Sequence, residues 1–401
     1  MIVAILFLTS MLVEFGFYIE NKFKINVLVE SLPVFMSMSC LFFMGITFNI
    51  QSDLFEDLWQ MMQDDWAEER REEETKIKND YAETGLLMAK SLAGLALSGV
   101  VIFVTVTPFL AEILDYFKPL NESRSPLLPF PAIEVFQMDG VFYQTLIVEE
   151  ITTFVCITYG VAFTCIASTH CMHANGMFAV IGYRLENLLP ENLRYSTDYN
   201  LVSENCRKSL VVCIKRHQLA LQFMSLVDEY YGPAVAIYVI GSIFMVSPTL
   251  TMLADTKFHY MAVVQILIIV GFLYMISYLG QKVIDMSSEL SQKAYLGDWS
   301  RGAPHVQRLI MHILRRSEKY SSINALSLFT LSFDFFRMLL LMLEYRLIHS
   351  DWNNLGLTKH SSLRSYWTCT LINKHCIDSD ITRRLKDSCF VHFKTILIFS
   401  D

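Results

Sequence analysis

Seven long apolar stretches constrain the fold of this chain more than any other feature. A helix needs about 20 mostly apolar residues to cross the hydrocarbon core of a bilayer. The stretches of this kind are 2–19, 26–49, 86–114, 144–169, 232–254, 260–281 and 325–345. We therefore expect an all-α polytopic membrane protein with seven transmembrane helices.

The composition supports this expectation. Of the 401 residues, 53% are hydrophobic and only 18% are charged, whereas soluble domains usually carry about 25% charged residues. The first apolar stretch has no basic segment before it and no small-residue cleavage site before Glu20, so we interpret it as a first span, or equally as an uncleaved signal anchor. The net charge of −8 argues against nucleic acid as a partner.

Lys and Arg are distributed unevenly over the connections, and this predicts the orientation in the membrane. The connections after the second, fourth and sixth stretches hold 17 of these residues, and those after the first, third and fifth hold 5. The first group, and with it the N-terminus, is therefore predicted to be cytoplasmic. The only N-glycosylation sequon begins at Asn121 in the third connection, which this rule places outside, so we expect glycosylation there.

This orientation separates the chain from G-protein-coupled receptors, whose N-terminus is extracellular. A membrane enzyme is the other alternative, but metal-dependent desaturases and hydroxylases use several histidine boxes. Here His170 and His173 form one such pair, and the Cys and His residues of the C-terminal region fit no common zinc site. The sequence also contains no P-loop and no GxSxG motif. We expect no enzymatic activity, no metal and no cofactor.

Amphipathic segments occur in the connections that are predicted to be cytoplasmic. Residues 304–316 carry an apolar stripe that a helix there must bury. Residues 213–230 predict a cytoplasmic helix that leads into the fifth span. The segment from Leu58 to Trp66 has apolar residues at helical spacing before a dense run of charge. We interpret it as an extension of the second span, with a docking surface for a partner as the alternative.

Four stretches, in this order, resemble segments of the insect odorant receptor family. They are LLPFPAIEVF before the fourth span, LVVCIKRHQLALQF ahead of the fifth, YLGQKVIDMSSELSQKAYLGDW at the exit of the sixth and LSLFTLSFDFF at the start of the last. The resemblance covers about residues 5–343 and includes the inverted topology. A gustatory-type receptor channel shares this fold and topology, and only the details of the motifs separate the two.

The resemblance implies an all-helical subunit, four of which surround a pore lined by the seventh helix, with cytoplasmic helices packed into an anchor. The family pairs a ligand-tuning subunit with a common co-receptor. This chain lacks the long insertion between spans 4 and 5 that the co-receptor carries, so it resembles a tuning subunit. The function implied is an odorant-gated, non-selective cation channel in the plasma membrane of sensory neurons, opened by small volatile odorants.

In this topology the outer halves of the spans offer a mostly apolar pocket with a few polar groups. The candidate ligand-binding residues are Phe35, Met36, Phe103, Thr107, Phe109, Thr152, Thr153, Tyr159, Tyr260 and Gln265. Each of them could instead pack helices together. The candidate pore or gate residues on the last span are Asp334, Arg337, Leu341 and Tyr345.

The last span and the C-terminal region depart from the family pattern. Asp334 and Arg337 are three residues apart and can pair at the cytoplasmic mouth. Relatives continue with apolar residues, whereas Arg346 follows here, and an Arg that lines the outer pore would oppose cations. We expect a receptor-like subunit over 1–345 and a poorly ordered, atypical tail over 346–401. Our hypothesis is a truncated start and a read-through past a splice junction.

Overall fold

The computed structural model describes residues 2–22, 24–106, 141–254, 260–326 and 328–354, together with residues 109 and 116. The chain divides into two compact units, Met1–Leu343 and Glu344–Asp401.

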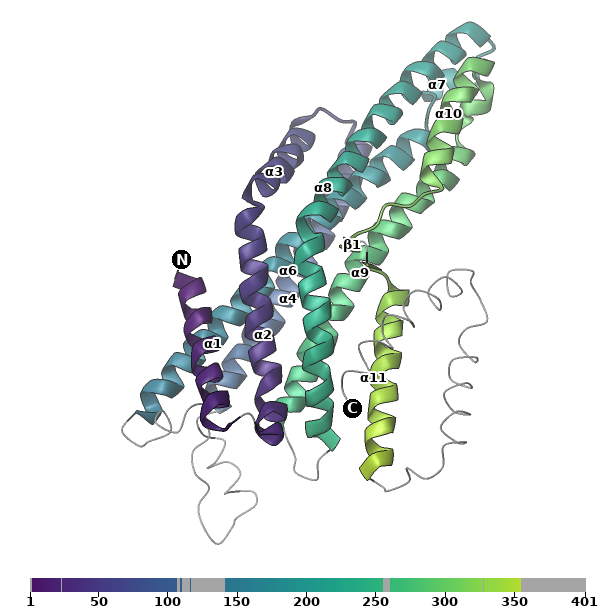
Figure 1. Ribbon diagram of the computed structural model, residues 1–401. Coiled ribbons are helices and arrows are strands. Elements are labelled where there is room, and N and C mark those ends of the chain that lie inside the picture. The colour runs from purple at the N-terminus through teal and green to yellow at the C-terminus, as the bar shows by residue number, and fades with distance from the viewer. Residues whose placement is uncertain are drawn as a thin grey trace. The chain divides into compact units, whose positions relative to one another are not determined.

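Seven long helices dominate the described residues (Figure 1), and each overlaps one of the predicted spans. They are α1 (Ile2–Glu20), α2 (Ile25–Ile50), α4 (Glu72–Val106), α6 (Phe142–Glu186), α8 (Tyr199–Ala254), α9 (Tyr260–Leu296) and α11 (Phe333–Asn354). Within the described ranges, α2, α6, α8 and α9 are long and apolar enough by length and composition alone to cross a membrane. The all-α prediction with several apolar spans is confirmed.

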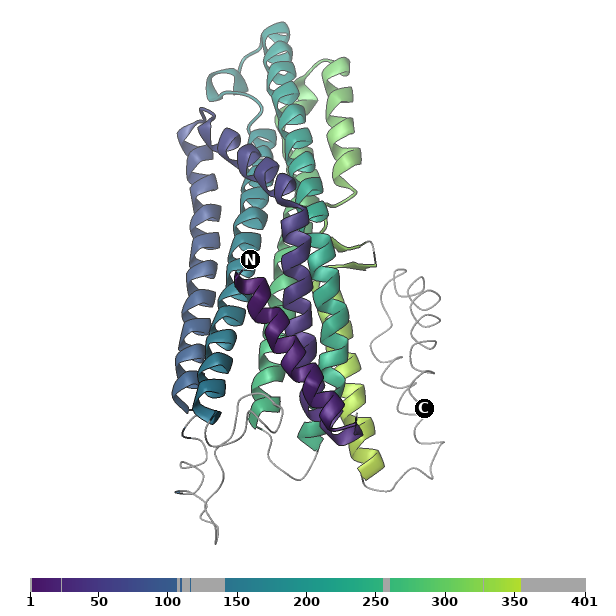
Figure 2. The same ribbon diagram turned by 60° about the vertical axis from the view of Figure 1, so that its left-hand side comes forward.

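The shorter elements gather mainly at one end of the long helices, where α6 ends and α8 begins (Figures 1 and 2). They are α3 (Ser52–Ala67), α7 (Glu191–Arg194), a 3-10 helix η2 (Asp298–Arg301) and α10 (Pro304–Ser317). The charge rule predicts that this end is cytoplasmic, and we call it the inner end. A short hairpin of β1 (Asn324–Ala325) and β2 (Phe329–Thr330) joins α10 to α11.

Several helices are much longer than a membrane is thick. α6 has 45 residues, which makes it about 68 Å long at 1.5 Å per residue, about twice the hydrocarbon thickness. The predicted fourth span, 144–169, is therefore only the outer part of α6. The predicted helix over 213–230 is present, and it is continuous with the fifth span in α8; its cytoplasmic location stays a prediction of the charge rule.

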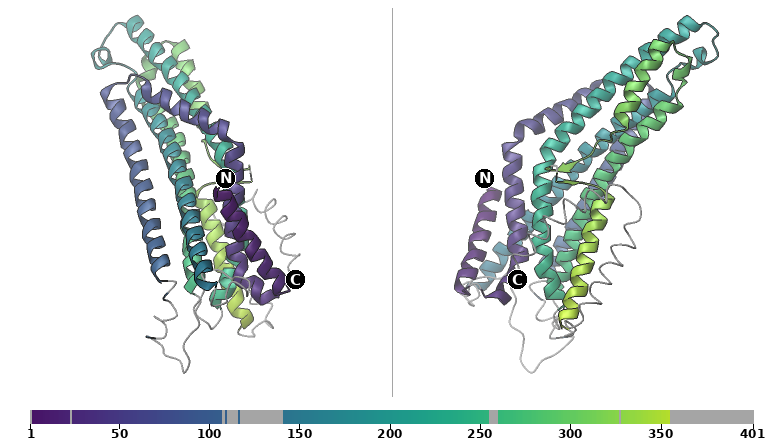
Figure 3. Two further views of the ribbon diagram at one scale, coloured as in Figure 1. Left: turned by 90° about the vertical axis from the view of Figure 1, so that its left-hand side faces the viewer. Right: turned by 45° about the vertical axis from the view of Figure 1, so that its right-hand side comes forward.

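Burial differs between the two halves of these helices. Every residue of α6 from His170 to Gly182 is buried, because the inner part of α6 is surrounded by neighbouring helices. Large apolar side chains of α4, among them Leu87, Leu95 and Val101, are exposed in the subunit, as expected for a helix that faces lipid. α4 lies beside α6 along much of its length (Figures 2 and 3).

The amphipathic segment predicted over 304–316 forms α10, which confirms that prediction. Pro304 occupies the first turn, where its missing N–H costs nothing. Val306, Ile310 and Ile313 are buried against α8 and α9 of the same chain. The apolar stripe is therefore part of the subunit's own core.

Two predicted boundaries were wrong. The segment from Leu58 to Trp66 does not extend the second span, because α2 ends at Ile50 and α3 starts as a separate helix at Ser52. The last span was predicted from residue 325, but that region pairs as the β1–β2 hairpin. The hydroxyl of Ser332 accepts a hydrogen bond from the Phe335 N–H at 3.2 Å, so the side chain caps the first turn of α11.

At its other end α11 continues to Asn354, past the predicted end of the last span at residue 345. Of the expected tail over 346–401, residues 346–354 belong to α11, and the rest lies outside the described residues.

Candidate functional site

The structure describes six of the ten candidate ligand residues as buried or half-buried side chains. They are Phe35, Met36, Thr152, Thr153, Tyr159 and Gln265. Phe109 is 55% exposed. The side chains of Phe103, Thr107 and Tyr260 lie outside the described residues, as does Asn121.

One group of candidates lies where α2 meets α1 and α6. Phe7, Met38 and Cys156 form a small buried cluster there, and the Cys156 Sγ lies 3.3 Å from the Met38 Sδ. The Tyr159 ring packs edge-on against Phe7 at 6.2 Å between centroids. Phe35 makes a similar contact with Tyr18 of α1 at 5.7 Å. This side of α2 is therefore largely aromatic and sulfur-containing.

The two threonines of this group direct their hydroxyl protons into their own helix. Thr152 Oγ1 donates to the Val148 carbonyl at 2.8 Å and Thr153 Oγ1 donates to the Glu149 carbonyl at 2.9 Å. Each hydroxyl keeps lone pairs that can accept a hydrogen bond. A ligand that met either hydroxyl would therefore act as the donor.

A buried carboxylate lies on the same side of α2. Glu14 of α1 is only 3% exposed, and its Oε2 atom has no hydrogen-bond partner among the described residues. Ionisable side chains within a membrane span are costly and are functional candidates for that reason. The sequence prediction did not include Glu14.

The other group of candidates lies where α2 meets α8 and α9. Gln265 Nε2 donates to the Ser37 hydroxyl at 3.4 Å, and this hydroxyl lies 3.0 Å from the Met245 sulfur. Ser37 itself donates to the Pro33 carbonyl at 2.8 Å. The candidates thus occupy two regions of α2, one toward α1 and α6 and the other toward α8 and α9.

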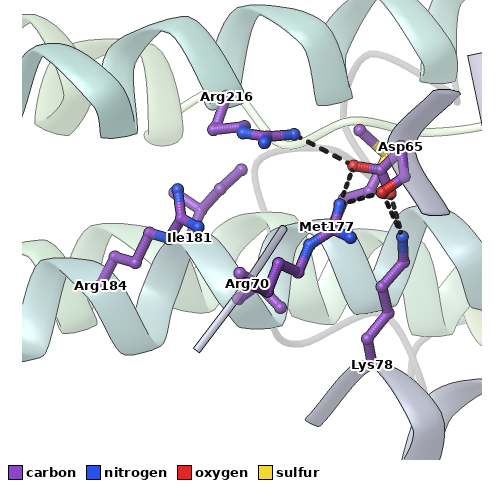
Figure 4. Close-up of a pocket in the computed structure, with 8 residues that line it drawn as sticks. Asp65, Arg70, Lys78, Met177, Ile181, Arg184 and Arg216 are labelled. Carbon is purple, nitrogen blue, oxygen red and sulfur yellow. Dashed lines mark hydrogen bonds and ion pairs between the residues drawn. The ribbon is translucent and has the colours of Figure 1, made fainter. Parts of the chain in front are cut away.

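A charged cluster at the inner end connects four segments around one buried carboxylate (Figure 4). Asp65 of α3 is 5% exposed. Its carboxylate forms ion pairs with Arg70 at 2.6 Å, with Lys78 of α4 and with Arg216 of α8 at 3.2 Å. His173 of α6 places its Nε2 atom 3.3 Å from the same carboxylate.

Charge and burial oppose each other in this cluster. Burial alone would raise the pKa of Asp65, but the hydrogen bond and charge of Lys78, with His173 and Arg70, hold that pKa below its usual value. Lys78 shares the single carboxylate with two guanidinium groups, and burial lowers its pKa to about 8. Its ammonium also lies 4.0 Å from the Trp66 ring centroid, which favours the cation.

The cluster borders a cavity of about 20 Å³ that Arg184 and hydrophobic residues of α6 also line. Arg184 is held by two hydrogen bonds to Glu74, at 2.9 and 2.6 Å. A cavity of this volume can hold a water molecule, whereas pockets for small ligands measure about 300–1,000 Å³. The cavity is therefore too small for an odorant, and the cluster serves to join α3, α4, α6 and α8.

The histidine pair has packing partners. His170 Nδ1 lies 2.8 Å from the Tyr231 hydroxyl, and the His173 ring packs against Phe223 at 5.1 Å. In the part of the chain that the structure describes, no group of three or more His, Cys, Asp or Glu side chains could hold a metal ion.

The candidate pore residues lie along α11. Asp334 and Arg337 are exposed near its start, and Leu341 is half-buried. The side chain of Tyr345 lies outside the described residues. Asp334 is in the first turn, where a negative charge stabilises the helix dipole.

Sequence reasoning missed Asp65, although a signal was present. Leu58, Met62 and Asp65 follow one another at helical spacing, and all three are buried. An acid on the apolar side of an amphipathic helix indicates a buried ion pair. No comparable signal indicated Ser37, because its partners Met245 and Gln265 are far away in the sequence.

Comparisons with known proteins agree with this architecture. The profile of a family described as "7tm Odorant receptor" matches residues 24–342. The olfactory receptor OR5 of the insect Machilis hrabei in complex with eugenol has a similar structure, with a TM-score of 0.67 and 17% sequence identity over 87% of each chain. A second structure of the same OR5 gives a TM-score of 0.65 and 17% identity, over 86% of this chain and 87% of the other. Comparison with curated proteins gave no match.

Proposed function

The chain belongs to the seven-transmembrane odorant receptor family, and we propose that it is a ligand-tuning subunit of an odorant-gated cation channel. The family is one of multi-pass membrane receptors and not of enzymes. The observation that carries the proposal is the family match, which extends over 24–342 and so includes every long helix except α1 and the end of α11.

The proposed ligand is a small, mostly apolar volatile molecule. Both regions of α2 in the outer half present aromatic, aliphatic and sulfur-containing side chains with a few hydroxyl, amide and carboxyl groups. This is the chemistry of a site for small organic ligands. The related OR5 structure contains eugenol, and a molecule of that class, with an aromatic ring and a phenol, suits the region that holds Tyr159 and Thr152.

The proposed pore helix is α11, with Asp334, Arg337, Leu341 and Tyr345 as the pore or gate residues. We propose that a co-receptor completes a hetero-tetramer, because this chain lacks the insertion between spans 4 and 5 that marks the co-receptor. The proposed location is the plasma membrane of sensory neurons. A gustatory-type receptor channel remains the second candidate function, since it shares the fold and topology.

Current recording tests the proposal. The chain would be expressed in cells with and without an insect odorant co-receptor, and a panel of volatiles that includes eugenol would be applied, with sugars and bitter compounds as the control panel. We expect cation currents in response to one or more volatiles only when both subunits are present. Currents evoked only by the control panel would favour the gustatory alternative. Surface expression without any response would contradict the proposal.

A further inference from the structure

We propose that the β1–β2 hairpin is the element through which α8 and α9 move α11, and that Asp228 and Gln281 are the positioning residues of this connection. The inference rests on the proposed function, because it assumes that α11 lines a gated pore. The two strands pair antiparallel, with Asn324 opposite Thr330, and the chain enters α11 three residues after Thr330.

Asp228 of α8 holds the first strand through two hydrogen bonds from one residue. The Asn324 backbone N–H donates to the Asp228 Oδ1 at 2.5 Å, and the Asn324 Nδ2 donates to the Oδ2 at 3.2 Å. The Asn324 Oδ1 accepts a hydrogen bond from the Thr330 hydroxyl at 2.9 Å. A single side chain therefore links α8 to both strands. Hydrogen bonds to a carboxylate are roughly twice as strong as those between neutral groups.

Two glycines allow the hairpin to lie directly against both helices. A Cβ atom on Gly232, one turn after Asp228 on α8, would lie 2.8 Å from the Asn324 carbonyl oxygen. A Cβ atom on Gly280 of α9 would lie 2.6 Å from the Leu331 Cβ. Real Cβ contacts are essentially never this short, so any larger residue would separate the hairpin from that helix.

Gln281 of α9 holds the start of α11. Its Oε1 accepts a hydrogen bond from the Phe333 N–H at 3.1 Å, one of the N–H groups that a helix start leaves without an internal partner. Its Nε2 donates to the Asp285 carboxylate at 2.8 Å, which fixes the orientation of the amide. The Phe333 ring also stacks on Tyr274 of α9 at 6.1 Å.

The same two helices carry residues of the candidate ligand site. Met245 of α8 and Gln265 of α9 meet at Ser37 in the outer half. Ala325 and Leu331, in and beside the hairpin, are at most 2% exposed and belong to the hydrophobic core of the subunit. A ligand that binds better to one arrangement of α8 and α9 shifts the population toward it, and the hairpin passes this shift to the first turn of α11.

The experiment separates transmission from ligand binding. Asp228→Ala removes the link, and Glu229→Ala, a change at the neighbouring acid, is the matched control. Each would be expressed with the co-receptor, and the half-maximal odorant concentration for current would be measured at equal surface protein. We expect Asp228→Ala to raise this concentration by about tenfold, the effect of losing charge-assisted hydrogen bonds. Odorant-dependent thermal stabilisation of the purified chain should change much less. Glu229→Ala should match the unmodified chain.

A reciprocal exchange decides the result even if Asp228→Ala folds poorly. In the double variant Asp228→Asn and Asn324→Asp, the amide and the carboxylate trade places and the hydrogen bonds between the two side chains can re-form. Recovery of the original half-maximal concentration by the pair supports the proposal. Unchanged activation in surface-expressed Asp228→Ala, or a well-expressed pair that still activates poorly, overturns it. The absence of any odorant response in the unmodified receptor would instead contradict the proposed function.

Discussion

At the scale of single residues, Asp65 illustrates how much can depend on one buried carboxylate. Three cations from Arg70, α4 and α8 share it. Since removal of one partner from a buried ion pair leaves uncompensated charge, such changes cost about 3–5 kcal/mol. We expect Asp65→Asn to lower the free energy of unfolding by this amount. The thermal midpoint of the detergent-solubilised chain should fall accordingly. Asp64→Asn, at an exposed neighbour, should leave the midpoint unchanged. Equal midpoints for the two variants would contradict this role for Asp65.

Lys78 makes the stability of the same cluster depend on pH. Burial lowers its pKa from 10.5 to about 8 in the folded chain, whereas the unfolded chain keeps the higher value. Between these two pH values the folded chain binds fewer protons at Lys78, so its stability rises with pH and is lost again as the pH falls toward 8. In this window, the free energy of unfolding of the unmodified chain should rise with pH more steeply than that of Lys78→Met, by at most about 1.4 kcal/mol per pH unit. Parallel stability curves for both chains over pH 8–10 would exclude the effect.

Thr152 provides a test of ligand chemistry at a single atom. Because its proton is donated to the Val148 carbonyl, the hydroxyl can only accept a hydrogen bond from a ligand. For odorants that carry a hydroxyl group, Thr152→Val should therefore raise the half-maximal concentration by about fivefold. This factor corresponds to the loss of one hydrogen bond of about 1 kcal/mol. Odorants with only ether or ester oxygens should be unaffected. Thr152→Ser keeps the hydroxyl and should behave like the unmodified chain. An equal shift for every odorant would point to gating and not to binding.

At the scale of elements, α10 shows that an amphipathic stripe need not mark a surface between subunits. Ile310 is fully buried and the adjacent Met311 is 58% exposed. A charge buried at Ile310 has no partner and should prevent α10 from packing. We expect Ile310→Asp to be lost from the cell surface and Met311→Asp to fold normally. Surface staining and size-exclusion profiles would measure this, and normal folding of both variants would show that α10 does not need its apolar face.

The exposed side of the same helix is where contacts with another subunit are to be tested. Ile313 is buried within the chain, so a change there would test folding. Met311→Asp is the cleaner variant, because loss of co-purification with the co-receptor at normal surface expression would assign this side of α10 to assembly.

At the scale of the whole molecule, the direction of the chain through the membrane can be tested directly. The excess of Lys and Arg in the connections after the second, fourth and sixth spans predicts a cytoplasmic N-terminus and a glycan at Asn121. An N-terminal epitope should stain only after the cells are permeabilised. Asn121→Gln should increase electrophoretic mobility to that of the glycosidase-treated chain. Staining of intact cells would overturn the topology.

Much of this protein follows from the sequence by itself. The apolar stretches predicted the seven long helices, and the stripe over 304–316 predicted α10. Both predictions succeed because the length and the periodicity of an apolar stretch are local properties of the sequence. Apolar side chains in or beside the membrane must either be buried in the protein or be exposed to lipid. The order of the four motifs along the chain likewise predicted the family.

The tertiary structure decided the rest. Which region of α2 each candidate residue occupies, why the segment before α11 forms a hairpin, and which groups surround Asp65 all depend on partners distant in the chain. Asp228 and Asn324 are 96 residues apart, and Arg216 lies 151 residues from Asp65. Nothing local in either segment specifies such a partner, because a buried polar group is stabilised by whichever complementary group the packing of the helices brings to it.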